Sequence, residues 1–321
     1  MIIIVYINEF YNIYHSEEDL MLEVKNVTLK YGDFVAVDNL SFEVNQGEIF
    51  GLLGTNGAGK TTTFRTIMGL LYPSSGYVRY DGSFVSYDTV DKIGYMIEER
   101  SLLTKMTVKD LMLYFGQLKN VPVKTILERL DMWLERFEIK DYKMKKIKEL
   151  SKGNQQKIQF ISALINEPSL LVLDEPFSGL DVINIQLFVD VIREYQQKGC
   201  TIIFSSHQID HVESFCERLV VLQKGKSVIN GLITDIKKEF KKHNIKVVVD
   251  DLDKDHLLSI KGVYDVIRHA NEWEIKIEDE SVSNDVFNYI KTLPNVKKYD
   301  VEQASLSEIF IAKVGKKYEE A

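Results

Sequence analysis

A glycine-rich loop at residues 54–61 constrains this chain more than any other feature. The loop fits the pattern G-x-x-x-x-G-K-[ST] and directly follows an apolar run at residues 49–53, which predicts a buried strand. Residues 62–70 predict a helix after the loop. In such a turn, successive backbone N–H groups and the helix N-terminus present partial positive charge to an anion. We therefore expect a phosphate-binding site formed by Gly54, Thr55, Asn56, Gly57, Ala58, Gly59, Lys60, Thr61 and Thr62.

Two side chains of this loop suit a nucleoside triphosphate. We expect Lys60 to reach the β- and γ-phosphates and the hydroxyl of Thr61 to ligate Mg²⁺. The alternative is a glycine-rich turn with an incidental lysine. A chance match of this length occurs on the order of once per hundred chains, and the strand–loop–helix context makes chance rarer still. The loop therefore predicts that the chain binds a nucleoside triphosphate with Mg²⁺.

A second apolar run, at residues 170–173, ends in two carboxylates, Asp174 and Glu175. Beside a phosphate loop, Asp174 can hold Mg²⁺ directly or through water, and Glu175 can act as the general base or position the attacking water. A strand that ends in acids is, taken alone, usually a strand that meets solvent. The two segments together predict that the loop and the acid pair converge on one magnesium-bound triphosphate.

The order of these patterns along the chain predicts its organisation. Strand and helix patterns alternate over residues 22–230, which predicts an α/β fold with a mainly parallel, helix-covered sheet. Within this stretch, about residues 97–167 lack the strand pattern, and apolar residues recur there at helical spacing, so we expect a helical subdomain. Residues 231–321 change character again and predict a small α+β module. That module includes a hairpin with arms at 263–269 and 273–277.

Residues 1–20 differ from the rest of the chain, because they are rich in Ile, Tyr and acidic side chains. The clean strand pattern begins only after Met21. We interpret residues 1–20 as a dispensable extension and residues 21–230 as the nucleotide-binding domain. A short ordered arm is the alternative for the first segment.

Composition restricts the class of partner. The formal net charge of −8 argues against broad binding to nucleic-acid phosphates. The two cysteines, Cys200 and Cys216, have no spacing typical of zinc or a disulfide framework, so a reducing cytoplasm fits best. No apolar run approaches the roughly 18–20 residues that span a bilayer. If the chain serves a membrane, we expect it to dock there on a separate protein.

Four further segments, in the same order as in a known family, complete the pattern. Residues 150–156 resemble the L-S-x-G-x-x-Q signature of ATP-binding-cassette (ABC) ATPases, and residues 178–181 resemble their D-loop. His207 resembles the family's switch histidine, which contacts the γ-phosphate. Tyr31 lies at the place of its adenine-stacking aromatic; an aromatic strand residue packed in the core is the alternative. The resemblance covers about residues 22–230, and it implies that Ser151 and Gly153 contact the γ-phosphate of ATP held by a second subunit.

One position departs from the family pattern. The family usually carries glutamine where this chain has Glu98, within residues 93–99. A glutamate there can still bind Mg²⁺ or water, but it adds negative charge beside a phosphate. Similar Glu-Glu-Arg stretches, and a C-terminal module like the one that contains residues 305–310, are features of a bacterial subgroup that includes sodium- and drug-export ATPases. The resemblance is therefore to that subgroup.

The resemblance implies an ATP-hydrolysing subunit, peripheral on the cytoplasmic face of the membrane. Two ATPase subunits, identical or paired, would bind ATP between them and drive separate permease subunits for export. A soluble member of the family acting in translation or DNA repair is the alternative. The single phosphate loop, the lack of sustained heptads and the acidic charge weigh against it. An inactive binding module is disfavoured because Lys60, Asp174, Glu175 and His207 are all present.

Overall fold

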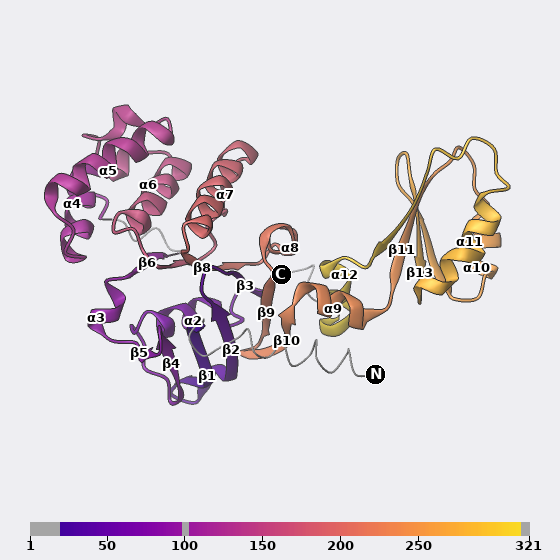
Figure 1. Ribbon diagram of the computed structural model, residues 1–321, viewed down its shortest axis with the longest axis horizontal. Helices are drawn as coiled ribbons and strands as arrows, with labels where there is room; N and C mark the ends of the chain where they lie inside the picture. Colours follow the sequence, from indigo (N-terminus) through magenta and orange to yellow (C-terminus); the bar gives the residue numbers. More distant parts are fainter. Residues whose placement is uncertain (1–19, 98–102, 316–321) are drawn as a thin grey trace, which may run out of the picture. The chain divides into compact units, whose positions relative to one another are not determined.

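The computed structural model describes residues 20–97 and 103–315. The chain forms two compact units, of which the first ends at Asn230 and the second begins at Gly231. The sequence prediction for residues 1–20 falls almost entirely outside the described residues, as does Glu98. Figure 1 shows the helices and strands of each unit.

A six-stranded sheet forms the centre of the first unit. Its strand order is β10-β9-β3-β8-β7-β6. Strands β9, β3, β8, β7 and β6 pair in parallel, as the alternating pattern predicts. Because they are parallel, their carboxyl ends lie at one edge of the sheet, where β3, β7 and β8 each lead into a predicted site residue. The strand bounds are β3 (Ile49–Gly54), β6 (Ile93–Met96), β7 (Leu170–Leu173), β8 (Thr201–Ser206), β9 (Arg218–Gln223) and β10 (Lys226–Leu232).

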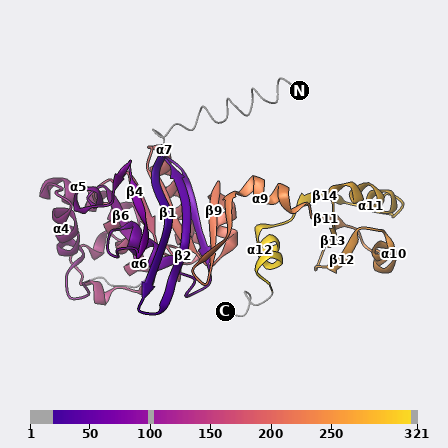
Figure 2. The same ribbon diagram turned by 90° about the horizontal axis from the view of Figure 1, so that it is seen from below.

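A second, antiparallel sheet has the order β2-β1-β4-β5. Helix α2 (Lys60–Ile67) follows the phosphate loop. One hydrophobic core contains side chains from both sheets and from α2, including Val24, Phe64 and Val172. Figure 2 shows the two long strands β1 and β2. The elements here are β1 (Leu20–Tyr31), β2 (Phe34–Asn45), β4 (Ser75–Tyr80), β5 (Ser83–Phe84) and the short helix α3 (Tyr87–Val90).

Helices dominate the chain between β6 and β7, as predicted. They are α4 (Val108–Leu118), α5 (Val123–Arg136) and α6 (Lys152–Leu164), with 3₁₀ turns at Lys140–Tyr142 and Ile147–Glu149. Helices α7 (Val182–Gln197) and α8 (Ile209–Phe215) follow β7 and β8. A buried aromatic cluster joins three of these segments: Phe160 of α6 stacks on Phe188 of α7 at 4.3 Å, and Phe137, just after α5, packs edge-on against both.

The second unit is an α+β module with a four-stranded antiparallel sheet in the order β12-β13-β11-β14. The predicted hairpin is confirmed by the pairing of β12 with β13. The core of this unit combines the sheet with α10 and α11, through Leu257, Val286 and Ile290. Its elements are α9 (Ile233–Phe240), β11 (His243–Val248), α10 (Lys254–Ser259), β12 (Val263–Arg268), β13 (Trp273–Ile277), a 3₁₀ turn at Glu280–Val282, α11 (Ser283–Ile290), β14 (Lys298–Gln303) and α12 (Leu306–Val314).

Both cysteines are buried as free thiols in the first unit. Burial raises the pKa of Cys200 to about 12 and the pKa of Cys216 well above its ordinary value. Neither thiol is therefore poised as a nucleophile. Within residues 20–97 and 103–315, no helix is both long enough and apolar enough to cross a membrane.

Candidate nucleotide site

The phosphate loop leaves β3 and enters α2 through backbone that only glycine tolerates well. Gly59 has a φ of 109°, and a Cβ at this position would lie 2.7 Å from the carbonyl oxygen of Ala36. Gly57, with a φ of 77°, also lies in the left-handed region. These glycines let the loop wrap tightly, and the hydrogen bond from Thr63 N to Gly59 O at 2.9 Å then begins the helix.

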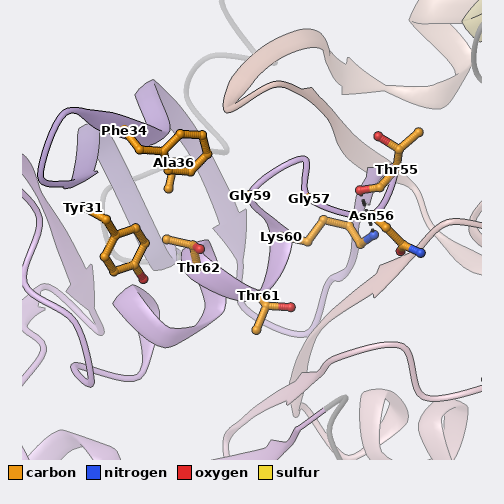
Figure 3. Close-up of a pocket in the computed structure, with 10 residues that line it drawn as sticks. All are labelled: Tyr31, Phe34, Ala36, Thr55, Asn56, Gly57, Gly59, Lys60, Thr61 and Thr62. Carbon is orange, nitrogen blue, oxygen red and sulfur yellow. Dashed lines mark hydrogen bonds between the residues drawn. The ribbon is translucent and has the colours of Figure 1, made fainter. Parts of the chain in front are cut away.

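A cavity of about 290 Å³ opens over this loop (Figure 3). One end is aromatic: Tyr31 and Phe34 are paired residues at the tip of the β1–β2 hairpin, and they are 48% and 65% exposed. The alternative in which Tyr31 packs in the core is therefore wrong. Gly54 and Ala58 lie outside the lining, at the buried base of the loop. The lining consists of Tyr31, Phe34, Ala36, Thr55, Asn56, Gly57, Gly59, Lys60, Thr61 and Thr62.

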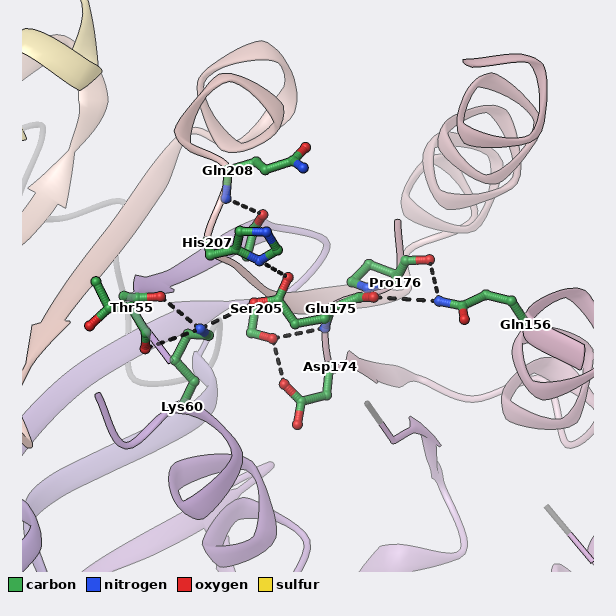
Figure 4. Close-up of polar contacts among 11 residues, drawn as sticks. Thr55, Lys60, Gln156, Asp174, Glu175, Pro176, Ser205, His207 and Gln208 are labelled. Carbon is green, nitrogen blue, oxygen red and sulfur yellow. Dashed lines mark hydrogen bonds and ion pairs between the residues drawn. The ribbon is translucent and has the colours of Figure 1, made fainter. Parts of the chain in front are cut away.

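Lys60 connects this cavity to the acid pair. Its Nζ donates to the carbonyl oxygen of Gly54 at 2.7 Å and, at longer range, to that of Thr55 at 3.4 Å. The same Nζ lies 3.1 Å from Oε1 of Glu175 (Figure 4), and both side chains are about 5% exposed. The structure thus brings together two segments that are more than a hundred residues apart in the chain.

The acid pair directly follows β7 and is held by the neighbouring strand β8. The Ser205 hydroxyl donates to Oδ1 of Asp174 at 2.5 Å and accepts the N–H of Glu175 at 2.9 Å. Oε2 of Glu175 lies 2.9 Å from Nδ1 of His207. Glu175 has a φ of 49°, which is unusual for a residue with a side chain. A continuous polar chain therefore runs from Lys60 through Glu175 to His207 (Figure 4).

The donor set fits magnesium bound mainly through phosphate. In the described part of the chain, no cluster of three or more His, Cys, Asp or Glu side chains could hold a metal ion by itself. The available groups are the Thr61 hydroxyl at the cavity and the fully buried Asp174 carboxylate. Mg²⁺ commonly binds in this way, through one or two protein oxygens together with substrate phosphates and water.

Comparison with known proteins decides the family. The family model "ABC transporter" matches residues 37–178, and a DrrA1-3-like C-terminal domain model for ATP-binding proteins matches residues 231–314. The uncharacterized ABC transporter ATP-binding protein YhaQ of Bacillus subtilis (strain 168) is 45% identical over 299 residues, covering 93% of this chain and all of YhaQ. The chain belongs to the ABC transporter ATP-binding proteins.

Two further similarities support the ABC assignment. The probable multidrug ABC transporter ATP-binding protein YbhF of Escherichia coli (strain K12) is 35% identical over 222 residues, covering 68% of this chain and 38% of YbhF. A solved ATP-binding subunit of an ABC transporter superimposes with a TM-score of 0.65 at 29% identity, covering 68% of this chain and 93% of that subunit. The fold is therefore the predicted P-loop ABC ATPase, and the chain is the ATP-hydrolysing subunit of a transporter. The comparisons give no support to the translation or repair alternative.

The ABC signature segment lies away from the phosphate cavity of its own chain. Ser151 caps α6 by accepting the N–H of Asn154 at 3.3 Å, and it is exposed. Neither Ser151 nor Gly153 lines the cavity. The last residue of the segment, Gln156, is buried and donates to the carbonyl oxygen of Pro176 at 3.0 Å, so it fixes α6 to the chain just after the acid pair.

The D-loop ends in a cap for α7. The carboxylate of Asp181 accepts the N–H of Asn184 at 2.9 Å. That hydrogen bond lowers the pKa of Asp181, which remains ionised at neutral pH. The two exposed residues that follow it, Val182 and Ile183, begin the helix.

Three residues of the site escaped the sequence prediction: Phe34, Gln156 and Ser205. Phe34 could have been found, because a two-residue turn at Gly32-Asp33 places it opposite Tyr31. Gln156 was part of the quoted signature, but its spacing alone does not show that it bonds the segment after β7. Ser205 carried no signal, since its role depends on which strand lies beside β7.

Proposed function

We propose that two ATPase subunits bind two magnesium-ATP molecules between them and drive separate permease subunits for export. The observation that carries the site assignment is the 3.1 Å contact between Lys60, which lines the phosphate cavity, and Glu175 of the acid pair. It supports a single reaction centre in which the phosphate-binding group and the proposed base are adjacent.

Within that centre, each residue has a distinct role. Lys60 and the loop N–H groups would bind the β- and γ-phosphates, and Tyr31 would stack on the adenine ring. Thr61 and Asp174 would hold Mg²⁺, which when bound neutralises phosphate charge. Glu98 remains a proposed metal or water ligand outside the described residues.

From the contacts of Glu175 we infer how this proposed base becomes available. Its two carboxylate oxygens contact Lys60 and His207 respectively. A triphosphate in the cavity would compete for Lys60, because phosphate oxygens are strong acceptors for its Nζ. Glu175 would then take a proton from water as that water attacks the γ-phosphorus and ADP departs. His207 would position Glu175 and contact the γ-phosphate.

The signature segment supports a paired arrangement of ATPase subunits. Ser151 and Gly153 lie at the exposed start of α6, where backbone N–H groups and a hydroxyl offer donors to an anion. Since they do not line their own cavity, we assign them to the γ-phosphate held by a second subunit. ATP would then favour closure, because these contacts exist only in the closed pair.

The remaining assignments concern partners and location. Residues 21–230 would be the ATPase domain, about residues 97–167 its helical subdomain that faces the permease, and residues 231–321 an accessory domain. The multidrug description of YbhF and the DrrA-like C-terminal match support export. The subunit would act at the cytoplasmic face of the membrane, bound to its permease. Purification in mild detergent should recover a polytopic membrane protein; consistent absence of one would argue against this partner.

Replacing the proposed base tests the catalytic assignment. Glu175→Gln should keep ATP binding, reduce turnover by roughly 10²–10⁴-fold and accumulate an ATP-bound dimer. Phosphate release, nucleotide titration and light scattering after size exclusion would measure these effects. Glu167→Gln is a matched control, because Glu167 has the same φ of 49° but an exposed side chain.

Lys60→Ala should weaken ATP binding itself. Turnover that is unchanged in Lys60→Ala would remove the phosphate-loop assignment. Near-normal turnover in Glu175→Gln would show that another group is the base.

A further inference from the structure

The Ser205 side chain forms hydrogen bonds with both members of the acid pair (Figure 4). Its hydroxyl donates to the side chain of Asp174 at 2.5 Å and accepts from the backbone of Glu175 at 2.9 Å. We propose that Ser205 is a positioning residue, which holds the orientation of the Asp174 carboxylate that would bind Mg²⁺ and fixes the backbone from which Glu175 would act. This inference rests on the proposed function of the two acids.

The hydrogen-bonding capacity of a hydroxyl suits this position. A hydroxyl carries one proton to donate and lone pairs to accept, so it can serve a carboxylate and an N–H together. Ser205 and Asp174 are both completely buried, so bulk water does not compete for the hydrogen bond between them. A buried carboxylate with one oxygen held by a short hydrogen bond has a restricted orientation, which a metal ligand requires.

The backbone of Glu175 gives the second part of the argument. A residue with a side chain is held in the left-handed region only when its surroundings determine it. Here the N–H of Glu175 is bound by Ser205 from β8, while the carbonyl of the following Pro176 is bound by Gln156 from α6. These two contacts flank the strained residue. They therefore fix the backbone position from which the Glu175 side chain extends. The carboxylate of that side chain contacts both Lys60 and His207.

The next residue on β8 provides a matched comparison. Ser206 is also a buried serine, but its hydroxyl accepts the N–H of Gln208 at 2.9 Å. Ser206→Ala also removes a buried serine hydroxyl, but from the neighbouring residue, whose side chain points to the opposite face of the strand. An effect specific to the acid pair should follow Ser205 and not Ser206.

The test measures nucleotide binding without turnover. We would titrate the full chain with the non-hydrolysable analogue AMP-PNP by calorimetry, once with Mg²⁺ and once with EDTA. Ser205 is proposed to position Asp174, the proposed metal ligand. Ser205→Ala should therefore bind AMP-PNP roughly 10–100-fold more weakly with Mg²⁺, while its affinity for AMP-PNP in EDTA stays within about twofold of the native chain. Ser205→Thr, which keeps the hydroxyl, should retain the magnesium effect, and Ser206→Ala should resemble the native chain.

The outcomes separate this inference from the function on which it rests. A native chain that binds no AMP-PNP would overturn both. A magnesium effect that is unchanged in folded Ser205→Ala, or an equal loss with Mg²⁺ and with EDTA, would overturn the role of Ser205 alone. If circular dichroism shows that the alanine variant does not fold, Ser205→Cys replaces it. A thiol has a similar size but is a weak donor, so the same selective loss is expected.

Discussion

At the scale of single residues, the site depends on charges that are withdrawn from water and paired with one another. Lys60 and Glu175 are each about 5% exposed, and an isolated ion at that depth would be costly. Their mutual contact, with the carbonyl bond to Gly54 and the His207 contact, compensates for the lost hydration. The same contacts keep the proposed base, Glu175, within reach of Lys60, the lysine proposed to bind phosphate.

The two exposed aromatic residues over the cavity make a testable pair. Stacking of a base on an aromatic side chain contributes about 1–3 kcal/mol by alanine substitution. We expect Tyr31→Ala to weaken ATP binding by that amount and Phe34→Ala to weaken it as well, while Tyr31→Phe stays close to the native chain. Equilibrium titration with a fluorescent ATP analogue would measure the change. Tyr72→Ala is the control, because Tyr72 is 89% exposed and does not line the cavity.

If Tyr31→Ala and Phe34→Ala both bound ATP as tightly as Tyr72→Ala does, the aromatic end of the cavity would not be the base site.

The convergence of Lys60, Asp174, Glu175 and His207 was predictable for a simple reason. The loop that carries Lys60, the acid pair and His207 each follow a strand of one parallel sheet, and such strand ends share an edge. The sequence pattern did not show which side chains of neighbouring strands contact one another. Strand β8 could be recognised from its apolar residues, but only its pairing beside β7 shows that Ser205 faces Asp174.

At the scale of elements, helical spacing identified helices better than it identified their buried faces. The helical spacing of apolar residues within about residues 97–167 includes Leu111, Tyr114, Phe115 and Leu118, which lie in α4. Yet only Leu111 of these four is buried, whereas Tyr114 and Leu118 are 45% and 49% exposed. Periodicity reports which residues share a face of the helix, but it does not report whether a neighbouring element covers that face.

The buried aromatic cluster should contribute much of the stability of this helical region. Phe160→Ala removes a fully buried ring that stacks on Phe188, so we expect a loss of about 3–5 kcal/mol in the free energy of unfolding. The chain has two tryptophans, and Trp133 packs against Phe137 of this cluster. In a Trp273→Phe background, urea unfolding followed by fluorescence therefore reports on the cluster.

Tyr114→Ala is the control for that experiment, and it should change the free energy of unfolding by less than about 1 kcal/mol because its ring is half exposed. Equal effects of the two substitutions would contradict the assignment of the cluster as a stabilising core.

At the scale of the whole molecule, the two units have separate cores and separate fluorescent reporters. Trp133 belongs to the first unit and Trp273 to the second. The division near residue 231 was visible in the sequence because strand and helix patterns change there. The hydrogen bonds within the second unit could not be predicted from the sequence, since they join side chains from distant segments. The clearest example is Glu308, the third residue of α12.

Glu308 fixes α12 to the sheet of the second unit. Its carboxylate accepts hydrogen bonds from Lys276 of β13 at 2.6 Å and Asn244 of β11 at 2.6 Å. It also accepts the N–H of Ser305 at 2.9 Å, which completes a capping box. Burial acts to raise the pKa of Glu308, but the bonds from Lys276, Ser305 and Asn244 outweigh it and lower the pKa below 4.5. The folded state therefore favours the ionised carboxylate.

The lowered pKa of Glu308 determines how the free energy of unfolding changes with pH. A carboxyl group whose pKa is lower in the folded state stabilises the fold above its unfolded pKa, and the stability is lost as pH falls through the folded pKa. In a Trp133→Phe background, we expect Glu308→Gln to reduce the free energy of unfolding of the second unit by about 1–3 kcal/mol at pH 7. The difference from the native carboxyl should shrink as pH drops below 4.5. Glu302→Gln removes only a more exposed pair with Lys246 and should cost less than about 1 kcal/mol. A Glu308 effect that is independent of pH would show that the side chain acts through its shape and not through its charge.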